Sequence, residues 1–268
     1  MPGTAQFLAR ALAAAHAAAD AAAEGIRARY HAGNFSVEAK ADHTPVTEAD
    51  REAEIAIKHV LRAAFPGHAF LGEEEGREGD SEFLWLIDPI DGTKAFVRGY
   101  PFFSTQIALM HAGELVVGVS AAGEYGERAW ATRGSGAFLG SSVSDARAVR
   151  VSDAVAFGPM AAVSTGNLRS MAQDPARWNA LAGLVAQVGR IRGYGDFLHY
   201  HLLARGAIDL VVESDVNILD IAALTVIVRE AGGVFTTLEG GAISLDSTST
   251  LAGTPVLHAI ALRQFNAG

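Results

Sequence analysis

The sequence predicts a layered α/β protein in which helices cover β-sheets. Two patterns support this prediction: the chain opens with two long helical stretches, and from about residue 160 short strand-like runs alternate with helical ones. Such alternation is typical of sheets covered by helices. The chain has 268 residues, half of them hydrophobic, and no cysteine. That length fits one large domain or two joined halves, with a core that needs no disulfides.

The first half supplies two helices and a series of strands. Residues 4–30 are rich in alanine, which favours a helix, and residues 46–65 form a second helical pattern with Thr47 as a candidate N-cap. Short apolar runs predict strands at residues 68–71, 83–87, 104–110, 114–120, 128–132 and 137–139. The last four of these runs form two hairpins, because glycine-containing turns separate their members.

The second half alternates between the two kinds of element. Strands are expected at residues 160–164, 190–192, 208–212, 234–237 and 256–261, and helices at 175–188, 197–204 and 220–231. The polar stretch 140–147 between the halves is expected to be a surface loop or a seam. We therefore expect a single domain over 1–268, with an N-terminal half of about 1–145 and a C-terminal half of about 146–268.

The charge balance restricts the partners. A formal net charge of −9 argues against nucleic acid or an anionic membrane as the main partner. No apolar run has membrane-spanning length, and the alanine-rich start is interrupted by His16 and Asp20, unlike a signal peptide. These features predict a cytoplasmic protein. An acidic chain that binds phosphate needs a local source of positive charge, such as a metal cluster.

Carboxylates gather directly after the first two strand-like runs. Glu73 follows one run, and Asp88 and Asp91 follow the next. Asp88 and Asp91 lie three residues apart across a turn, so both can point at one spot. Pro89 restrains the backbone between them and leaves the Ile90 carbonyl free to face the same way. Asp-Pro and Asp-Gly are common in ordinary turns, but the repetition after two buried strands favours a site.

A cluster of carboxylates is expected to hold a metal. Like charges repel unless a cation offsets them, and hard cations such as Mg²⁺ prefer oxygen ligands. Zinc is disfavoured because no histidine or cysteine has zinc-like spacing. Gly92 and Thr93 open a short helical stretch at 94–97, whose free backbone N–H groups suit a phosphate oxygen. Thr93 can alternatively act only as an N-cap.

Several other residues have two readings from the sequence alone. Asp220 and Asp50 each lie near the start of a helix, where an aspartate commonly acts as a cap or complements the helix dipole. His199 and His201 flank Tyr200 and can touch a ligand, but a half-buried position on a helix is the simpler interpretation. Neither pair is assigned to a site on this basis.

Three motifs, taken together, resemble the inositol monophosphatase superfamily. They occur in order along residues 36–240 and consist of Gly72-Glu73-Glu74, Asp88-Pro89-Ile90-Asp91-Gly92-Thr93, and Leu219-Asp220-Ile221-Ala222-Ala223 followed by Glu230-Ala231-Gly232-Gly233. The resemblance implies an α-β-α-β-α sandwich of the inositol monophosphatase and fructose bisphosphatase type. It also implies lithium-sensitive hydrolysis of a small phosphate monoester by a homodimer.

The resemblance further implies roles for particular residues. Two or three Mg²⁺ ions, which Mn²⁺ can replace, are expected on Glu73, Asp88, the Ile90 carbonyl, Asp91 and Asp220. Asp50 is expected to pair with Thr93 and orient the attacking water, and Glu73 also counts among the catalytic residues. Asp220 thereby becomes an expected ligand, although its position alone indicates only a cap.

Within the superfamily, the chain is most similar to the histidinol-phosphate phosphatase branch. The similarity lies in Lys94, in Arg192-Gly193-Tyr194-Gly195-Asp196 and in Val212-Glu213-Ser214. Gly92 and Thr93 are expected to bind substrate together with Arg192, Asp196 and Glu213, since an acidic pair suits a cationic amine and imidazole. Inositol 1-phosphate and a 3′-phosphoadenosine nucleotide are the alternative substrates. A catalytically silent, metal-binding regulatory protein is the alternative of a different class.

Overall fold

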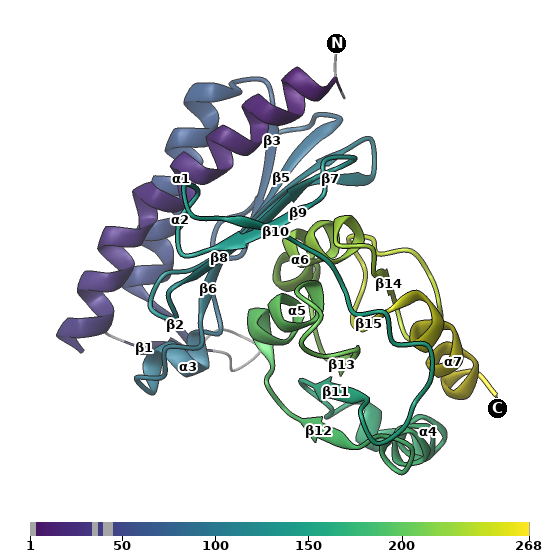
Figure 1. Ribbon diagram of the computed structural model, residues 1–268. Helices are drawn as coiled ribbons and strands as arrows, with labels where there is room; N and C mark the ends of the chain where they lie inside the picture. The colour runs from purple at the N-terminus through teal and green to yellow at the C-terminus, as the bar shows by residue number, and fades with distance from the viewer. Residues whose placement is uncertain (1–3, 34–36, 40–44, 268) are drawn as a thin grey trace.

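The protein is built in five layers (Figure 1). The computed structural model describes residues 4–33, 37–39 and 45–267. The α-helices of this part are α1 (Ala5–Ala32), α2 (Glu48–Ala64), α3 (Thr93–Val97), α4 (Pro175–Val185), α5 (Asp196–Ala204), α6 (Ile218–Glu230) and α7 (Pro255–Phe265), and a short 3-10 helix, η1, spans Met171–Gln173. Helices α1 and α2 cover one sheet, α5 and α6 lie between the two sheets, and α4 and α7 cover the far side. The predicted α-β-α-β-α sandwich is confirmed.

Helix α1 forms as its alanine content predicts, and it packs closely on the first sheet and on α2. Thr4 caps its start by accepting a hydrogen bond from the Phe7 N–H, and Gly33 ends it in the left-handed conformation. Most of its buried positions are alanines, so the backbone can approach the sheet closely. Thr47 caps α2, as predicted.

The first sheet carries most strands of the N-terminal half together with β10 (Arg147–Val149), which follows the boundary expected near residue 145. In order across the sheet they are β10, β9 (Ala137–Gly140), β8 (Glu127–Thr132), β7 (Glu114–Ala122), β6 (Ser104–His111), β5 (Phe83–Asp91), β3 (Ala69–Gly72) and β4 (Gly76–Glu78). A small separate pair is formed by β1 (Val37–Ala39) and β2 (Pro45–Thr47). Strands β3 and β5 are parallel, while β5 and its other neighbour β6 are antiparallel. Glu73 therefore follows β3 while Asp88 and Asp91 lie in the last residues of the longer β5, so all three are at the same end of two adjacent parallel strands.

The second sheet lies in the C-terminal half. Its order is β12 (Arg190–Arg192), β11 (Ala162–Thr165), β13 (Leu210–Ser214), β15 (Ser249–Gly253) and β14 (Val234–Thr236). The strand expected at residues 256–261 is wrong, because this stretch belongs to helix α7. Thr254 caps α7 and Pro255 occupies its first turn, which is a favoured helix start. The strand instead precedes it, as β15.

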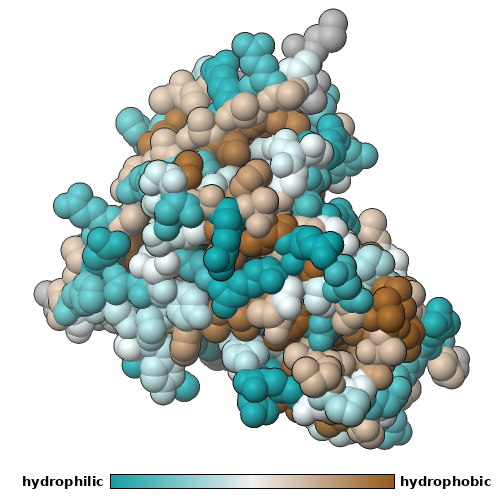
Figure 2. Space-filling view, in the orientation of Figure 1, coloured by the Kyte–Doolittle hydropathy of each residue, from teal (hydrophilic) through white to brown (hydrophobic). Residues whose placement is uncertain are grey.

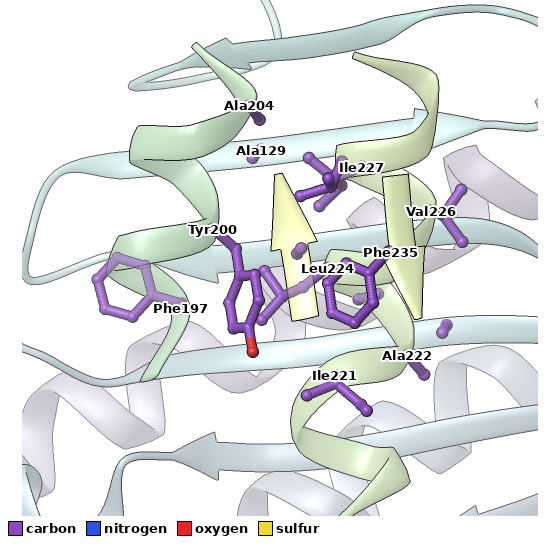
Figure 3. Packing of buried hydrophobic residues seen from close by; sticks show 14 of the residues in the cluster. Ala129, Phe197, Tyr200, Ala204, Ile221, Ala222, Leu224, Val226, Ile227 and Phe235 are labelled. Carbon is purple, nitrogen blue, oxygen red and sulfur yellow. The ribbon is translucent and has the colours of Figure 1, made fainter. Parts of the chain in front are cut away.

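A continuous apolar core fills the space between the sheets. Figure 3 shows Tyr200 of α5 beside Phe235 of β14, with Ile227 of α6 among the same buried group. The Tyr200 and Phe235 rings stack with centroids 5.3 Å apart. The backbone of β7 touches α6 directly, because Gly118 has no side chain to separate it from Ala223. Helix α6 is thus fixed against the first sheet.

The surface mixes hydrophilic and hydrophobic residues. Figure 2 shows this mixture over one face, with a hydrophobic group beside α7. Within the described ranges, none of the helices combines the length and the apolar character needed to cross a membrane.

Candidate active site

A bulge in β5 brings Asp88 and Asp91 to one face of the sheet. Asp88 pairs with Gln106 of β6 and Asp91 pairs with Ser104, so β5 has one more residue than β6 over this interval. In a regular strand, residues three apart point to opposite faces, and one extra residue corrects this. The irregularity surrounds Pro89, which cannot donate to the ladder. Both residues are buried: 2% of the surface of Asp88 and 7% of the surface of Asp91 are exposed.

Glu73 reaches the same place from the neighbouring strand. Its main-chain N–H donates to the Ile87 carbonyl, 3.2 Å away, which places it next to Asp88. The turn that follows is held by the buried carboxylate of Glu54, which accepts the N–H groups of Glu74 and Glu75. Glu54 in turn forms an ion pair with the buried Lys58 on the same helix, α2, with 2.7 Å between the charged atoms.

Asp220 joins the cluster from the start of α6. Its carboxylate accepts the Asn217 N–H at 2.9 Å and the Asn217 side-chain amide at 2.7 Å, completing a capping box. One oxygen from each of Asp88, Asp91 and Asp220 lies within 4.8 Å of the others. The two readings of Asp220 are therefore compatible, because the residue caps its helix and also faces the β5 carboxylates.

The cluster is electrostatically unfavourable without a cation. Burial, followed by the carboxylates of Glu73 and Asp91, raises the pKa of Asp88 well above its usual range. Burial, followed by the charges of Asp196 and Asp220, likewise raises the pKa of Asp91. Burial also raises the pKa of Asp220 to about 7, with Glu73 contributing. Converging carboxylate oxygens of this kind fit a hard divalent cation, which would offset their repulsion.

Asp50 and Thr93 meet at the edge of this cluster. Asp50 is fully buried, and its Oδ2 accepts both the N–H and the hydroxyl of Thr47. The Thr93 hydroxyl lies 3.4 Å from Asp50 Oδ1 and 3.0 Å from the Ile90 carbonyl oxygen. Because a hydroxyl has one hydrogen, it donates to one of these acceptors at a time. The structure thus brings together the predicted pair and the predicted carbonyl.

A cleft of about 340 Å³ opens above these groups. Its lining consists of Glu73, Asp88, Ile90, Asp91, Gly92, Thr93, Lys94, Ala95, Asn167, Asp196, Asp215, Val216, Asn217 and Asp220. Gly92 adopts a φ of 90° and precedes α3, and a β-carbon there would lie 2.7 Å from the Phe102 carbonyl oxygen. The turn therefore requires glycine. The cleft receives residues from both halves of the chain.

The predicted substrate residues of the second half do not all reach this cleft. Asp196 begins α5 and lines the cleft, and burial, followed by the charge of Glu213, raises its pKa to about 6. Glu213 lines a smaller, deeper pocket and accepts hydrogen bonds from Tyr200 and from the N–H of Asn167. Arg192 is exposed on β12, bonds to a neighbouring carbonyl, and is absent from the lining.

Some functional contacts had no clear signal in the sequence. Gln106 and Ser104 both donate to Asp91 Oδ2, at 3.3 Å each. Their alternate spacing on a strand shows that they share a face, but only the pairing of β5 with β6 shows that Asp91 shares it too. His199 and His201, expected to be half-buried, are fully buried. Asn217, three residues before Asp220, fits a capping signal that the sequence does contain.

A layered fold with acidic residues that converge from both halves on one cleft fits a phosphoric monoester hydrolase. The family model described as "Inositol monophosphatase family" matches residues 8–267. The chain therefore belongs to the inositol monophosphatase family.

Relatives and solved structures agree with this assignment. The chain is 43% identical to the histidinol-phosphatase of Mycobacterium tuberculosis over 246 residues, which cover 90% of this chain and 92% of that protein. It is 41% identical to the histidinol-phosphatase of Streptomyces coelicolor over 216 residues, covering 79% and 80%. The crystal structure of the extragenic suppressor protein SuhB from Bartonella henselae superposes with a TM-score of 0.83 at 31% identity, covering 98% of this chain and all of that one.

Proposed function

We propose that the chain hydrolyses histidinol phosphate to histidinol and inorganic phosphate, with Mg²⁺ as its cofactor. The observation that carries this proposal is the acidic wall beyond the carboxylate cluster, where Asp196 lines the cleft and Glu213 lies behind it. Such a wall suits the amine of histidinol, which carries positive charge, and its imidazole, which does so when it is protonated. Two relatives at 41% and 43% identity that are named histidinol-phosphatase support the same substrate.

The residues of the cleft support a displacement by water at phosphorus. The carboxylates of Glu73, Asp88, Asp91 and Asp220 would hold the metal, together with the Ile90 carbonyl. When bound, Mg²⁺ supplies positive charge that neutralises the phosphate group and the developing charge of the leaving oxygen.

Asp50 and Thr93 have the geometry to orient the attacking water. Asp50 is held rigidly by two hydrogen bonds from Thr47, so its Oδ1 and the Thr93 hydroxyl form a fixed pair of polar groups. Attack by water forms one phosphorus–oxygen bond and breaks the bond to the substrate oxygen. That oxygen takes up the proton that the attacking water releases and leaves as the hydroxyl of histidinol, while the oxygen of the water becomes part of the inorganic phosphate.

A panel of three phosphate esters tests the substrate. Histidinol phosphate, inositol 1-phosphate and a 3′-phosphoadenosine nucleotide are compared by phosphate release, with Mg²⁺ and with EDTA. We expect the highest kcat/KM for histidinol phosphate and no turnover in EDTA. A higher kcat/KM for another ester would replace the substrate, and a lack of hydrolysis throughout would favour a catalytically silent regulatory protein.

A single variant tests the acidic wall. Asp196→Asn keeps the shape of the side chain but removes its charge, and a hydrogen bond to a charged group contributes about 1.5–3 kcal/mol. We therefore expect kcat/KM for histidinol phosphate to fall roughly 10- to 100-fold, and that for inositol 1-phosphate to change much less. Asp246→Asn is the matched control, because Asp246 is an exposed acid away from the cleft. Equal losses on both esters would contradict the assigned role.

A further inference from the structure

A buried chain of polar side chains connects Asp91 to helix α5. Gln106 Nε2 donates to Asp91 Oδ2 at 3.3 Å and to Ser120 Oγ at 3.1 Å. On the other side of Ser120, the Nε2 atom of His201 lies 2.9 Å from the same hydroxyl. Gln106, Ser120 and His201 are each at most 1% exposed. Bulk water therefore does not reach these groups, and their hydrogen bonds depend on one another.

The outer end of this chain sets the direction of its hydrogen bonds. Glu127 accepts from His201 Nδ1 at 2.9 Å and from Arg205 at 2.6 Å. A carboxylate that is paired with an arginine only accepts, so Nδ1 carries the ring hydrogen. Burial lowers the pKa of His201, and in the neutral ring Nε2 must then be an acceptor. The Ser120 hydroxyl consequently donates to His201.

This direction determines how the Gln106 amide is oriented. Because the Ser120 hydroxyl donates its one hydrogen to His201, its oxygen can only accept from Gln106. The Gln106 side chain must therefore present its NH2 group, and not its carbonyl oxygen, to Ser120. The same nitrogen also donates to Ser104 Oγ at 2.8 Å, so its two hydrogens are shared among three acceptors, and Ser104 in turn donates to Asp91 Oδ2 at 3.3 Å. A flipped amide would instead place its oxygen against the Asp91 carboxylate, with no hydrogen between them.

We propose that Gln106 is a positioning residue for Asp91, and that His201 sets its orientation through Ser120. The hydrogen bonds from Gln106 and Ser104 both fall on Oδ2, so Oδ1 of Asp91 receives neither and is left for a cation. The inference rests on the proposed metal site. His201 lies on the helix that begins with Asp196, so α5 lines the cleft at one end and supports Asp91 further along.

Direct titration of Mg²⁺ into the metal-free protein tests this role. Groups that orient metal ligands typically change metal affinity by 10- to 100-fold. We expect His201→Leu, Ser120→Ala and Gln106→Met each to weaken Mg²⁺ binding by about tenfold in isothermal calorimetry. His258→Leu is the matched control. His258 is also a buried histidine on a helix, α7, and it bonds to the Thr236 hydroxyl at 2.9 Å. We expect it to bind Mg²⁺ as the wild type does.

A double variant separates a transmitted effect from general destabilisation. If His201 acts through Gln106, His201→Leu should weaken binding no further in the Gln106→Met background. Ser120→Ala, which removes one oxygen atom, tests the same route should His201→Leu fail to fold. Losses that add in the double variant would overturn the inference, as would lower melting temperatures with wild-type affinity. A folded wild type that binds no Mg²⁺ would refute the proposed metal site, and this inference with it.

Discussion

Replacing Asp220 with asparagine should stabilise the metal-free protein even though it removes a proposed metal ligand. The pKa of Asp220 is raised from 3.8 to about 7, chiefly by burial. At pH 8 the carboxylate is ionised in both the folded and the unfolded state, so the folded state carries the full cost of the shift. Asparagine has nearly the same shape and no charge, and it therefore avoids that cost.

The size of the effect follows from two opposing contributions. The difference between the unfolded pKa of 3.8 and the folded pKa of about 7 corresponds to a destabilisation of about 4 kcal/mol. Asparagine keeps only part of the capping box with Asn217, which costs about 1–2 kcal/mol. The net gain is about 2 kcal/mol, or roughly 4–8 °C in Tm for a chain of this size.

Thermal unfolding followed by circular dichroism measures this difference. In EDTA at pH 8, Asp220→Asn should melt above the wild type. The gap should begin to shrink as the pH falls below about 7 and should be lost by about pH 4, because the folded wild type takes up the missing proton over this range. With Mg²⁺ at 100 times its Kd, the wild type should gain about 2.7 kcal/mol and the variant less. Asp246→Asn should melt like the wild type throughout. A variant that melts below the wild type in EDTA at pH 8 would refute the reasoning.

Three further predictions concern other parts of the molecule. Asp91→Asn should lower Mg²⁺-dependent phosphate release by at least about 100-fold, since even residues that only hydrogen-bond to metal ligands change activity 10- to 100-fold. Its far-ultraviolet circular dichroism spectrum should be unchanged. Turnover at the wild-type rate would exclude Asp91 as a ligand. Gly118→Ala should destabilise the fold by about 1–3 kcal/mol in urea unfolding, because its β-carbon would lie 2.4 Å from the Ala223 carbonyl oxygen. An unchanged free energy of unfolding would show that β7 and α6 can move apart without cost. Burial lowers the pKa of His16 to about 4, below its unfolded value of 6.5, so stability should be complete above pH 6.5 and fall towards pH 4. His16→Leu should lose less stability than the wild type between pH 7 and 5, and an identical pH profile would exclude His16 as a source of acid sensitivity.

The helices and most strands could be predicted from the sequence because their signals are local. Thr47 and the apolar period of α2 mark a helix without reference to the rest of the chain. Strand β15 was missed for the opposite reason. Apart from Leu251 its residues are small or polar, yet all five are buried between β13 and β14. Their burial comes from the neighbouring strands, which local composition does not reveal.

The site divides in the same way. Asp88 and Asp91 could be predicted from spacing, but the bulge that aligns them depends on pairing with β6. The position of Asp220 beside them depends on the packing of α6 between the sheets, so motif resemblance was needed to expect it. Arg192 shows the limit of that resemblance, because its side chain is exposed on the edge strand β12.

The position of α6 between the two sheets links cation binding to assembly of the molecule. The first half contributes Asp88 and Asp91, while Asp220 arrives only when α6 has docked onto the strands of the first sheet. If Asp220 increases the affinity for a cation, the bound cation must stabilise the docked position of α6 by the same free energy, since the linkage is reciprocal. A metal bound at this junction would therefore hold the two halves together. Removing it with a chelator should weaken the packing of α6 before it disturbs either sheet.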